Sequence, residues 1–259
     1  MKRIFLYISL LMLSAILGYI IFRMKPDQEK KVLTVDTEYA YVMKDDAIGT
    51  FMMYVSDETH DICNENRYMR MILEDKDKET KIELSLLDIE IGHEEYYLKE
   101  AYVKVFISFD IPIMTEDIVF DDAYLTLELT DQQSYEVRLG RVTFFKDAHD
   151  EQGLNWTSLS GIKQSNDLRS RIYEITVSCD GVTEEIEKID VGSKHLTTFS
   201  LDQQNLIITI EDADYLLYDV PIVITFVNGE RQVIANFRYI IDYVILKESG
   251  PMINVYTLD

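Results

Sequence analysis

Polar and apolar residues alternate with a period of two in several separate parts of the chain, which is the pattern of β-strands with one buried face. The segments that show it are 101–109, 125–129, 173–179, 222–226 and 233–241. After the first 31 residues, no stretch keeps a helical period for ten or more residues. Many short strands without intervening helices favour antiparallel sandwiches or a barrel. The sequence therefore predicts an all-β fold made of one or more antiparallel β-sandwich domains.

The strongest turn signal is the segment 227–230, which reads Val-Asn-Gly-Glu. Asn and Gly tolerate the positive φ angles that a two-residue hairpin turn requires. The segment lies between two alternating stretches, so it predicts a hairpin that joins strands 222–227 and 231–241.

The N-terminal segment has a different pattern, with 19 uncharged residues from Ile4 to Phe22. As a helix, this run spans roughly 28 Å, close to the hydrocarbon thickness of a bilayer. Basic residues flank it on both sides, and Pro26 then ends the helix. We expect one transmembrane helix that acts as a signal anchor. The alternative is a cleaved signal peptide, although its apolar region is normally shorter.

The sequence gives a weaker signal for the side of the membrane on which the rest of the chain lies. Lys2 and Arg3 stand before the apolar run, and Arg23 and Lys25 stand directly after it, so the positive-inside rule is nearly balanced. Large domains behind an N-terminal anchor translocate with little regard to their own charge. We therefore expect a single-pass membrane protein with the bulk of the chain on the extracytoplasmic side.

Charge narrows the range of partners. The formal net charge is −22, and since the first 31 residues carry six basic and two acidic side chains, residues 32–259 carry −26. A field of that sign repels phosphate backbones, which argues against nucleic acid as a partner. An acidic binding face and a solvated surface that keeps the protein soluble both remain open.

Composition suggests how the chain is divided. Residues 148–167 form part of the longest polar stretch, which is typical of a linker. We expect an anchor and basic flank over 1–31, a β-sandwich domain over 32–147, the linker over 148–167, and a second β-rich domain over 168–259.

No group of residues identifies a reaction. The chain lacks a nucleophile elbow, a phosphate-binding Gly loop and a dinucleotide fingerprint. Its four histidines are well separated and are expected at the surface. Among the acidic clusters, Glu211, Asp212 and Asp214 are weak candidates for Ca²⁺ ligands, with solvated loops as the alternative. No catalytic or cofactor-binding residue is predicted.

Two further features bear on binding and stability. Cys63 and Cys179 could form a disulfide or be two separate thiols. Trp156 is the only tryptophan and lies in the predicted linker, where an exposed aromatic ring could stack on a sugar or anchor a protein.

Taken together, these patterns predict a membrane-anchored, extracytoplasmic β-sandwich that acts as a binding or accessory module for a protein or cell-surface partner. The alternative is a membrane-anchored hydrolase or metal-dependent enzyme, whose site is assembled from distant strands.

Overall fold

A computed structural model describes most of the chain, namely residues 12, 14, 29–146, 154–163, 172–182, 184–192, 197–202, 204–211, 215–217, 219–238 and 245–258. The predicted anchor at 4–22 therefore lies outside the described residues, apart from Met12 and Ser14. Of the helices within the described ranges, none has the length and apolar character needed to cross a membrane.

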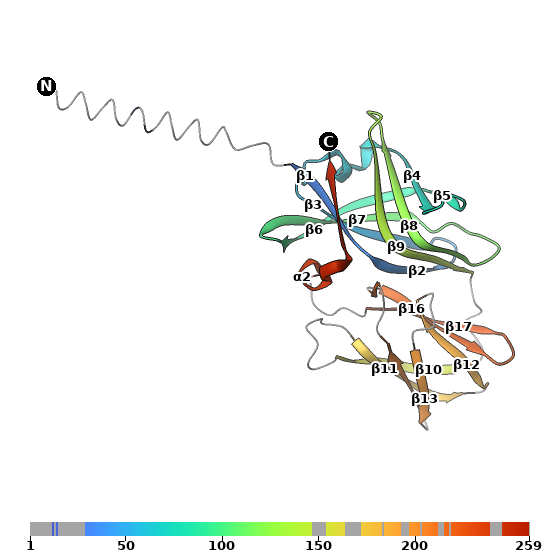
Figure 1. Cartoon of the computed structure of the whole chain (residues 1–259). Helices are drawn as coiled ribbons and strands as arrows, with labels where there is room; N and C mark the ends of the chain where they lie inside the picture. The colour runs from blue at the N-terminus through green and yellow to red at the C-terminus, as the bar shows by residue number, and fades with distance from the viewer. Residues whose placement is uncertain are drawn as a thin grey trace.

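The first part of the fold, which we call the first unit, consists of two sheets packed face to face (Figure 1). The five-stranded sheet has the order β18 (Ile253–Leu258), β1 (Lys30–Val35), β3 (Ile48–Val55), β7 (Glu100–Asp110) and β6 (Leu86–Tyr97). The six-stranded sheet has the order β15 (Leu216–Leu217), β2 (Thr37–Met43), β9 (Ser134–Lys146), β8 (Ile118–Leu129), β4 (Tyr68–Asp75) and β5 (Lys81–Leu84).

The core of the first unit lies between these sheets and is rich in aromatic rings. Phe51 and Phe109 of the five-stranded sheet stack with their ring centroids 4.5 Å apart. Tyr41 and Phe144 of the six-stranded sheet stack at 5.9 Å, and Tyr41 meets Phe109 edge to face. Aromatic pairs at these separations stabilise a core beyond the effect of their buried area.

The second unit is a smaller sandwich of two sheets. Its four-stranded sheet has the order β10 (Leu154–Lys163), β11 (Ile172–Val182), β14 (Asn205–Ile210) and β13 (Thr197–Asp202). Its three-stranded sheet has the order β12 (Ile186–Val191), β16 (Asp219–Phe226) and β17 (Arg231–Arg238). Aliphatic residues from both sheets, such as Val177, Ile208 and Ile224, form one buried cluster between them.

The described helices are short: η1 (Asp61–Cys63), η2 (Glu65–Arg67), α2 (Ile245–Ser249) and η3 (Gly250–Met252). Ile245 and Leu246 of α2 pack on Leu33, Tyr54 and Tyr102, in a cluster that also contains Met252 of η3. Neighbouring positions of these strands, such as Val32 and Val55, belong to the core between the two sheets. The segment α2–η3 therefore covers part of the outer face of the five-stranded sheet.

The all-β prediction is confirmed: the structure has several antiparallel sheets arranged in sandwiches. All five alternating segments contain strands, namely β7, β8, β11, β16 and β17. Two pairings are parallel instead, since β2 pairs in parallel with β9 on one side and with β15 on the other. Strand β2 is buried on nearly its whole length, which is common for parallel strands.

The hairpin is found at the predicted place, but its turn differs from the prediction. Gly229 has a φ of +85°, whereas Asn228 is not at positive φ. The Gly229 N–H donates to the Phe226 carbonyl, and the Phe226 N–H donates to the Glu230 carbonyl. This is a three-residue loop with glycine in the left-handed position, so the expected two-residue turn is wrong.

The structure also differs from the predicted organisation in two places. Residues 154–163 of the expected linker form strand β10, with Leu154 in the core of the second unit. The last strand, β18, pairs antiparallel with β1, so it belongs to the sheet of the first unit. The chain thus returns to the first unit after β17. The division into two domains remains a prediction, with the C-terminal strand assigned to the first.

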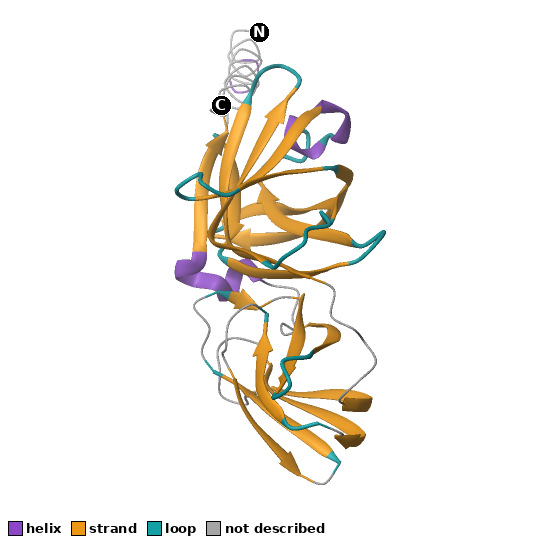
Figure 2. Ribbon diagram, turned by 90° about the vertical axis from the view of Figure 1, so that its right-hand side faces the viewer, coloured by secondary structure: helices purple, strands orange, loops and turns teal. Residues whose placement is uncertain are grey.

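The start of β1 and the end of β18 lie side by side. β1 begins and β18 ends near the end of the first unit that points away from the second unit, as both views show (Figures 1 and 2). The register pairs Lys30 with Leu258. The two units therefore follow one another along the long axis of the molecule.

Candidate functional site

The acidic segment expected to hold Ca²⁺ is only partly described. Glu211 is exposed directly after β14, whereas Asp212 and Asp214 lie outside the described residues. In the described ranges, no three or more His, Cys, Asp and Glu side chains are grouped so that they could hold a metal ion. A Ca²⁺ site at 211–214 stays a prediction.

His60 is buried, so the expectation that it lies at the surface is wrong. Its Nδ1 accepts the Ile62 N–H at 3.2 Å and caps η1, and its Nε2 lies 3.4 Å from the Tyr135 hydroxyl. Burial is the main cause that lowers the pKa of His60 below the ordinary value of 6.5. His93 is exposed at the surface of β6, while His149 and His195 lie outside the described residues.

Cys63 and Cys179 are both free thiols, so the structure has no bridge between them. Cys63 lies at the end of η1 in the first unit, and Cys179 lies in β11 of the second. Cys179 is buried in the core of the second unit, with its Sγ 3.4 Å from the Gln204 carbonyl. It fits a core thiol, which was one of the two alternatives left open.

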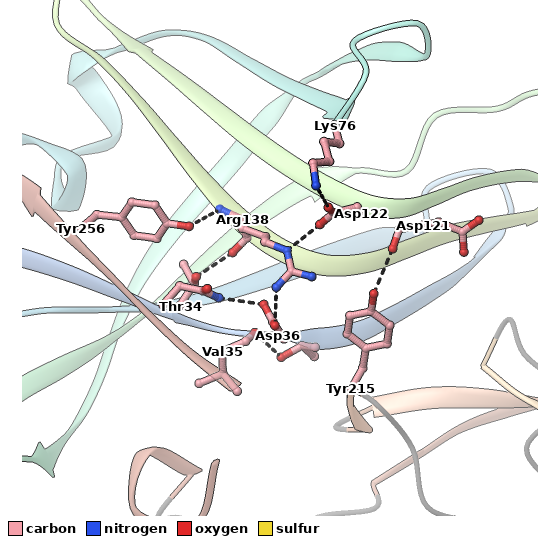
Figure 3. A network of polar contacts seen from close by, with 11 residues as sticks. Thr34, Val35, Asp36, Lys76, Asp121, Asp122, Arg138, Tyr215 and Tyr256 are labelled. Carbon is pink, nitrogen blue, oxygen red and sulfur yellow. Dashed lines mark hydrogen bonds and ion pairs between the residues drawn. The ribbon is translucent and has the colours of Figure 1, made fainter. Parts of the chain in front are cut away.

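A polar network surrounds Arg138 of β9 (Figure 3). Its guanidinium pairs with Asp36, between β1 and β2, and with Asp122 of β8. The second oxygen of Asp36 accepts a hydrogen bond from Asn254 at 2.7 Å. Although burial opposes the charge, the hydrogen bond of Asp122 and the charges of both aspartates raise the pKa of Arg138 above its ordinary value. Arg138 of β9 thus connects to β8 in the six-stranded sheet and, through Asp36 and Asn254, to β18 in the five-stranded sheet.

A second arginine, Arg141, links this region to the second unit. Its Nε donates to Asp121 Oδ1 at 2.9 Å, and its Nη1 lies 3.6 Å from Glu38. The Tyr215 ring lies 5.1 Å from the Arg141 guanidinium carbon, and its hydroxyl donates to the Asp121 carbonyl at 3.1 Å. Tyr215 directly precedes β15, in the connection between β14 and β16 of the second unit, so the contact holds this connection against the first unit.

The backbone adds to this contact region between the two units, which we call the joint. The Leu216 N–H donates to the Asp36 carbonyl at 2.8 Å, at the start of the parallel pairing of β15 with β2. Ala40 of β2 and Phe145 of β9 are buried in the same apolar cluster as Val220 and Ile222 of β16. A polar network and a shared apolar core therefore hold the two units in one orientation.

The outer face of the four-stranded sheet of the second unit is formed by twelve residues in three rows across β10, β11, β14 and β13. The rows are Ser158, Ser178, Asn205 and Asp202; then Ser160, Thr176, Ile207 and Ser200; then Ile162, Glu174, Thr209 and Thr198. We call these twelve positions the hydroxyl face, because seven of them are Ser or Thr.

The hydroxyl face is open, whereas the other face of the same strands is not. None of its twelve residues is buried in the described structure. The intervening residues Ile175, Val177, Leu206 and Ile208 are completely buried against the three-stranded sheet. Successive residues of a strand point to opposite sides, so the hydroxyl face must point away from the core.

Trp156 lies on the edge strand β10, two residues before Ser158, with 38% of its surface exposed. The register with β11 shifts on both sides of it, between Asn155 and Trp156 and again before Ser158. Bulges of this kind re-aim side chains at sheet edges.

Two sets of residues were not anticipated from the sequence. The first set is Arg138 and Arg141, which lie three residues apart in an otherwise largely apolar stretch. Two arginines in such a stretch are a signal that the strand makes ion pairs. The hydroxyl face was visible in part, as Glu174, Thr176 and Ser178 on the polar side of one predicted strand. Its full extent depends on pairings that single strands do not reveal.

No protein-family model and no curated protein matches the chain. Solved structures with distant similarity include SGBP-B from the mixed-linkage glucan utilization locus of Bacteroides ovatus, in complex with a mixed-linkage heptasaccharide. It is 14% identical, and the match covers 78% of this chain and 43% of that chain, with a TM-score of 0.23. SGBP-B from a complex xyloglucan utilization locus in Bacteroides uniformis is 13% identical over 81% of this chain and 48% of that one, with a TM-score of 0.24.

The sialic acid binding region of a Streptococcus sanguinis SK1 adhesin, bound to 3'sLn, is 9% identical over 81% of this chain and 76% of that one, with a TM-score of 0.22. The chain spans less than half the length of the two Bacteroides structures.

Proposed function

We propose that the chain is a membrane-tethered binding module: residues 4–22 span the membrane once, the two units lie on the outer side, and they bind a protein or glycan of the cell surface. No catalytic step is part of this proposal.

The observation that carries it is the arrangement of the two units relative to the start of β1. Strand β1 begins toward one end of the molecule, and the second unit lies at the other end (Figures 1 and 2). An anchor that precedes β1 would hold the first unit near the membrane and direct the second unit away from it. The joint supports this role, because a shared apolar core opposes the independent motion that is otherwise expected between domains.

The test is photo-crosslinking of the full chain in the membranes of the cells that make it. A benzophenone amino acid replaces Ser200 on β13, an exposed position of the second unit. The matched control carries the same group at Ser134, an exposed position where β9 of the first unit begins. We expect adducts of higher mass from position 200 and few from position 134.

If neither position gives adducts, a binding role for the second unit is contradicted. Equal adducts from both positions would contradict the assignment of binding to the second unit, because they would indicate contact along the whole molecule.

A further inference from the structure

The hydroxyl face consists mainly of short side chains that carry hydroxyl groups. Besides seven Ser and Thr residues it holds one Asn, two Ile and two carboxylates. The carboxylates, Glu174 and Asp202, lie in the two outer rows, so the middle row of Ser160, Thr176, Ile207 and Ser200 carries no charge. The face contains no Lys or Arg.

The six-stranded sheet of the first unit offers a contrast within the same chain. Its outward side includes long charged side chains that form ion pairs: Arg70 of β4 with Glu83 of β5 at 2.7 Å, and Glu136 of β9 with Lys78 of the β4–β5 turn at 2.8 Å. Such a face is typical of solvated sheets. The hydroxyl face lacks this pattern, although both faces belong to a strongly acidic protein.

We infer that the hydroxyl face is a binding site for an extended, uncharged polysaccharide, an inference that rests on the proposed binding function. A hydroxyl group both donates and accepts hydrogen bonds, so a row of Ser and Thr side chains matches the hydroxyl groups of a sugar chain. Short side chains also lose little conformational entropy when a ligand orders them.

The dimensions and charge of the face fit such a ligand. Four neighbouring strands and three alternate residues along each give an area of about 14 Å by 14 Å. Ile207 in the middle row provides an apolar contact for the C–H groups of a sugar ring. With a net charge of −22, the chain repels anionic polymers but not neutral ones.

Charge also disfavours the other obvious occupant, a second copy of this chain. Two molecules that each carry −22 would have to bring their carboxylates together, including Glu174 and Asp202 of both faces. A neutral polysaccharide avoids this repulsion.

The experiment is native affinity electrophoresis of the full chain, solubilised in a polyoxyethylene detergent that contains no sugar. The gels contain mixed-linkage glucan, xyloglucan, galactomannan or dextran as uncharged polysaccharides, or polygalacturonate as an anionic one. We expect at least one uncharged polysaccharide to retard the protein, and polygalacturonate to have no effect. Ser160→Lys with Ser200→Lys, at two exposed positions of the middle row, should weaken the retardation at least tenfold, whereas Ser134→Lys should leave it unchanged.

Each other outcome overturns the inference in a recognisable way. Retardation that Ser160→Lys with Ser200→Lys does not change would place the glycan site on another face. No retardation by any uncharged polysaccharide would exclude the ligand class, while the crosslinking at position 200 would still decide the proposed function. A dimer in sedimentation that these two substitutions abolish would show that a second copy covers the face.

Discussion

Lys104 of β7 and Glu95 of β6 form an ion pair of 2.7 Å with both side chains almost completely buried, at 2% and 1% exposure. The same carboxylate accepts the Tyr54 hydroxyl at 3.2 Å on one oxygen and the Leu246 N–H of α2 at 2.8 Å on the other. Glu95 therefore links the returning segment α2 to the five-stranded sheet by a buried hydrogen bond.

Removing one member of this pair should destabilise the protein strongly. In Lys104→Met the charge of Glu95 stays buried without its partner, and in Glu95→Gln the reverse holds. We expect each substitution to lower the free energy of unfolding by about 3–5 kcal/mol. The double variant should lose less than the sum of the two single losses, because it leaves no unpaired charge. Urea unfolding of the full chain, followed by circular dichroism, measures these values.

An exposed ion pair serves as the control. Arg70→Gln, which removes the partner of Glu83 at the surface, should leave the urea midpoint unchanged within error. A loss of similar size in Arg70→Gln and Lys104→Met would contradict the role given to burial.

Gly140 lies between Arg138 and Arg141 in β9 and sets the backbone geometry of the joint between the two units. Its φ is +113°, and a Cβ atom there would lie 2.5 Å from the backbone N and O of Thr37 on β2. We expect Gly140→Ala to lower the free energy of unfolding by at least about 2 kcal/mol, since both the strain and the backbone clash oppose it. Gly181→Ala in β11 is the matched control, because no atom lies within 4 Å of its Cβ position. Thermal unfolding of both variants should separate them clearly.

The period-two pattern was sufficient to predict strands such as β7 and β11, because alternation is a local property of a strand buried on one face. It could not reveal that β18 returns to pair with β1, more than 200 positions earlier in the chain. Nor could it show that β2 is parallel to β9, since pairing partners are decided by the packing of the whole sandwich. The turn at Gly229 was located by residue type, but its loop length was set by the register of β16 and β17.

His60 predicts a pH dependence of stability. Burial lowers its pKa in the folded protein below 6.5, so the unfolded chain binds the proton more readily. The stabilisation is fully present above pH 6.5 and is lost as the pH falls through the folded pKa. His60→Asn can still accept the Ile62 N–H as a cap but does not titrate. We expect a smaller drop in melting temperature between pH 7 and pH 5 for His60→Asn than for the unmodified protein. An identical drop would show that His60 does not contribute.

The two thiols should react slowly in the native state. Burial, with the charges of Asp57 and Glu58, raises the pKa of Cys63 from 9.0 to about 11. At pH 8 its thiolate population is then about a hundredfold below that of an unperturbed thiol, and alkylation should slow accordingly. Cys179 is buried and should also be protected. Titration after denaturation without reductant should find two thiols. Finding none would show a disulfide.

The candidate site was less accessible from the sequence than the fold. Thr176 and Ser178 were recognised as the polar side of one strand, but nothing local links them to Ser160 on β10 or Ser200 on β13. Likewise, Asp121 and Asp122 resemble an exposed acidic cluster until Arg141 and Arg138 are placed beside them. Sites built across strands depend on register, which arises only when the hydrophobic faces are packed.

The location of the two units decides which partners are available, and it rests on the anchor at residues 4–22. A large domain behind an N-terminal anchor usually crosses the membrane, but Arg23 and Lys25 directly after the apolar run oppose this orientation. We expect protease added to intact cells to remove the two units and leave a short membrane-bound fragment, while a cytoplasmic protein in the same cells stays intact. Immunoblotting against the C-terminal strand measures the loss. Complete protection, together with digestion after the cells are opened, would place the units inside. Polysaccharides of the cell surface would then be out of reach, and the partner of the hydroxyl face would have to be a cytoplasmic one.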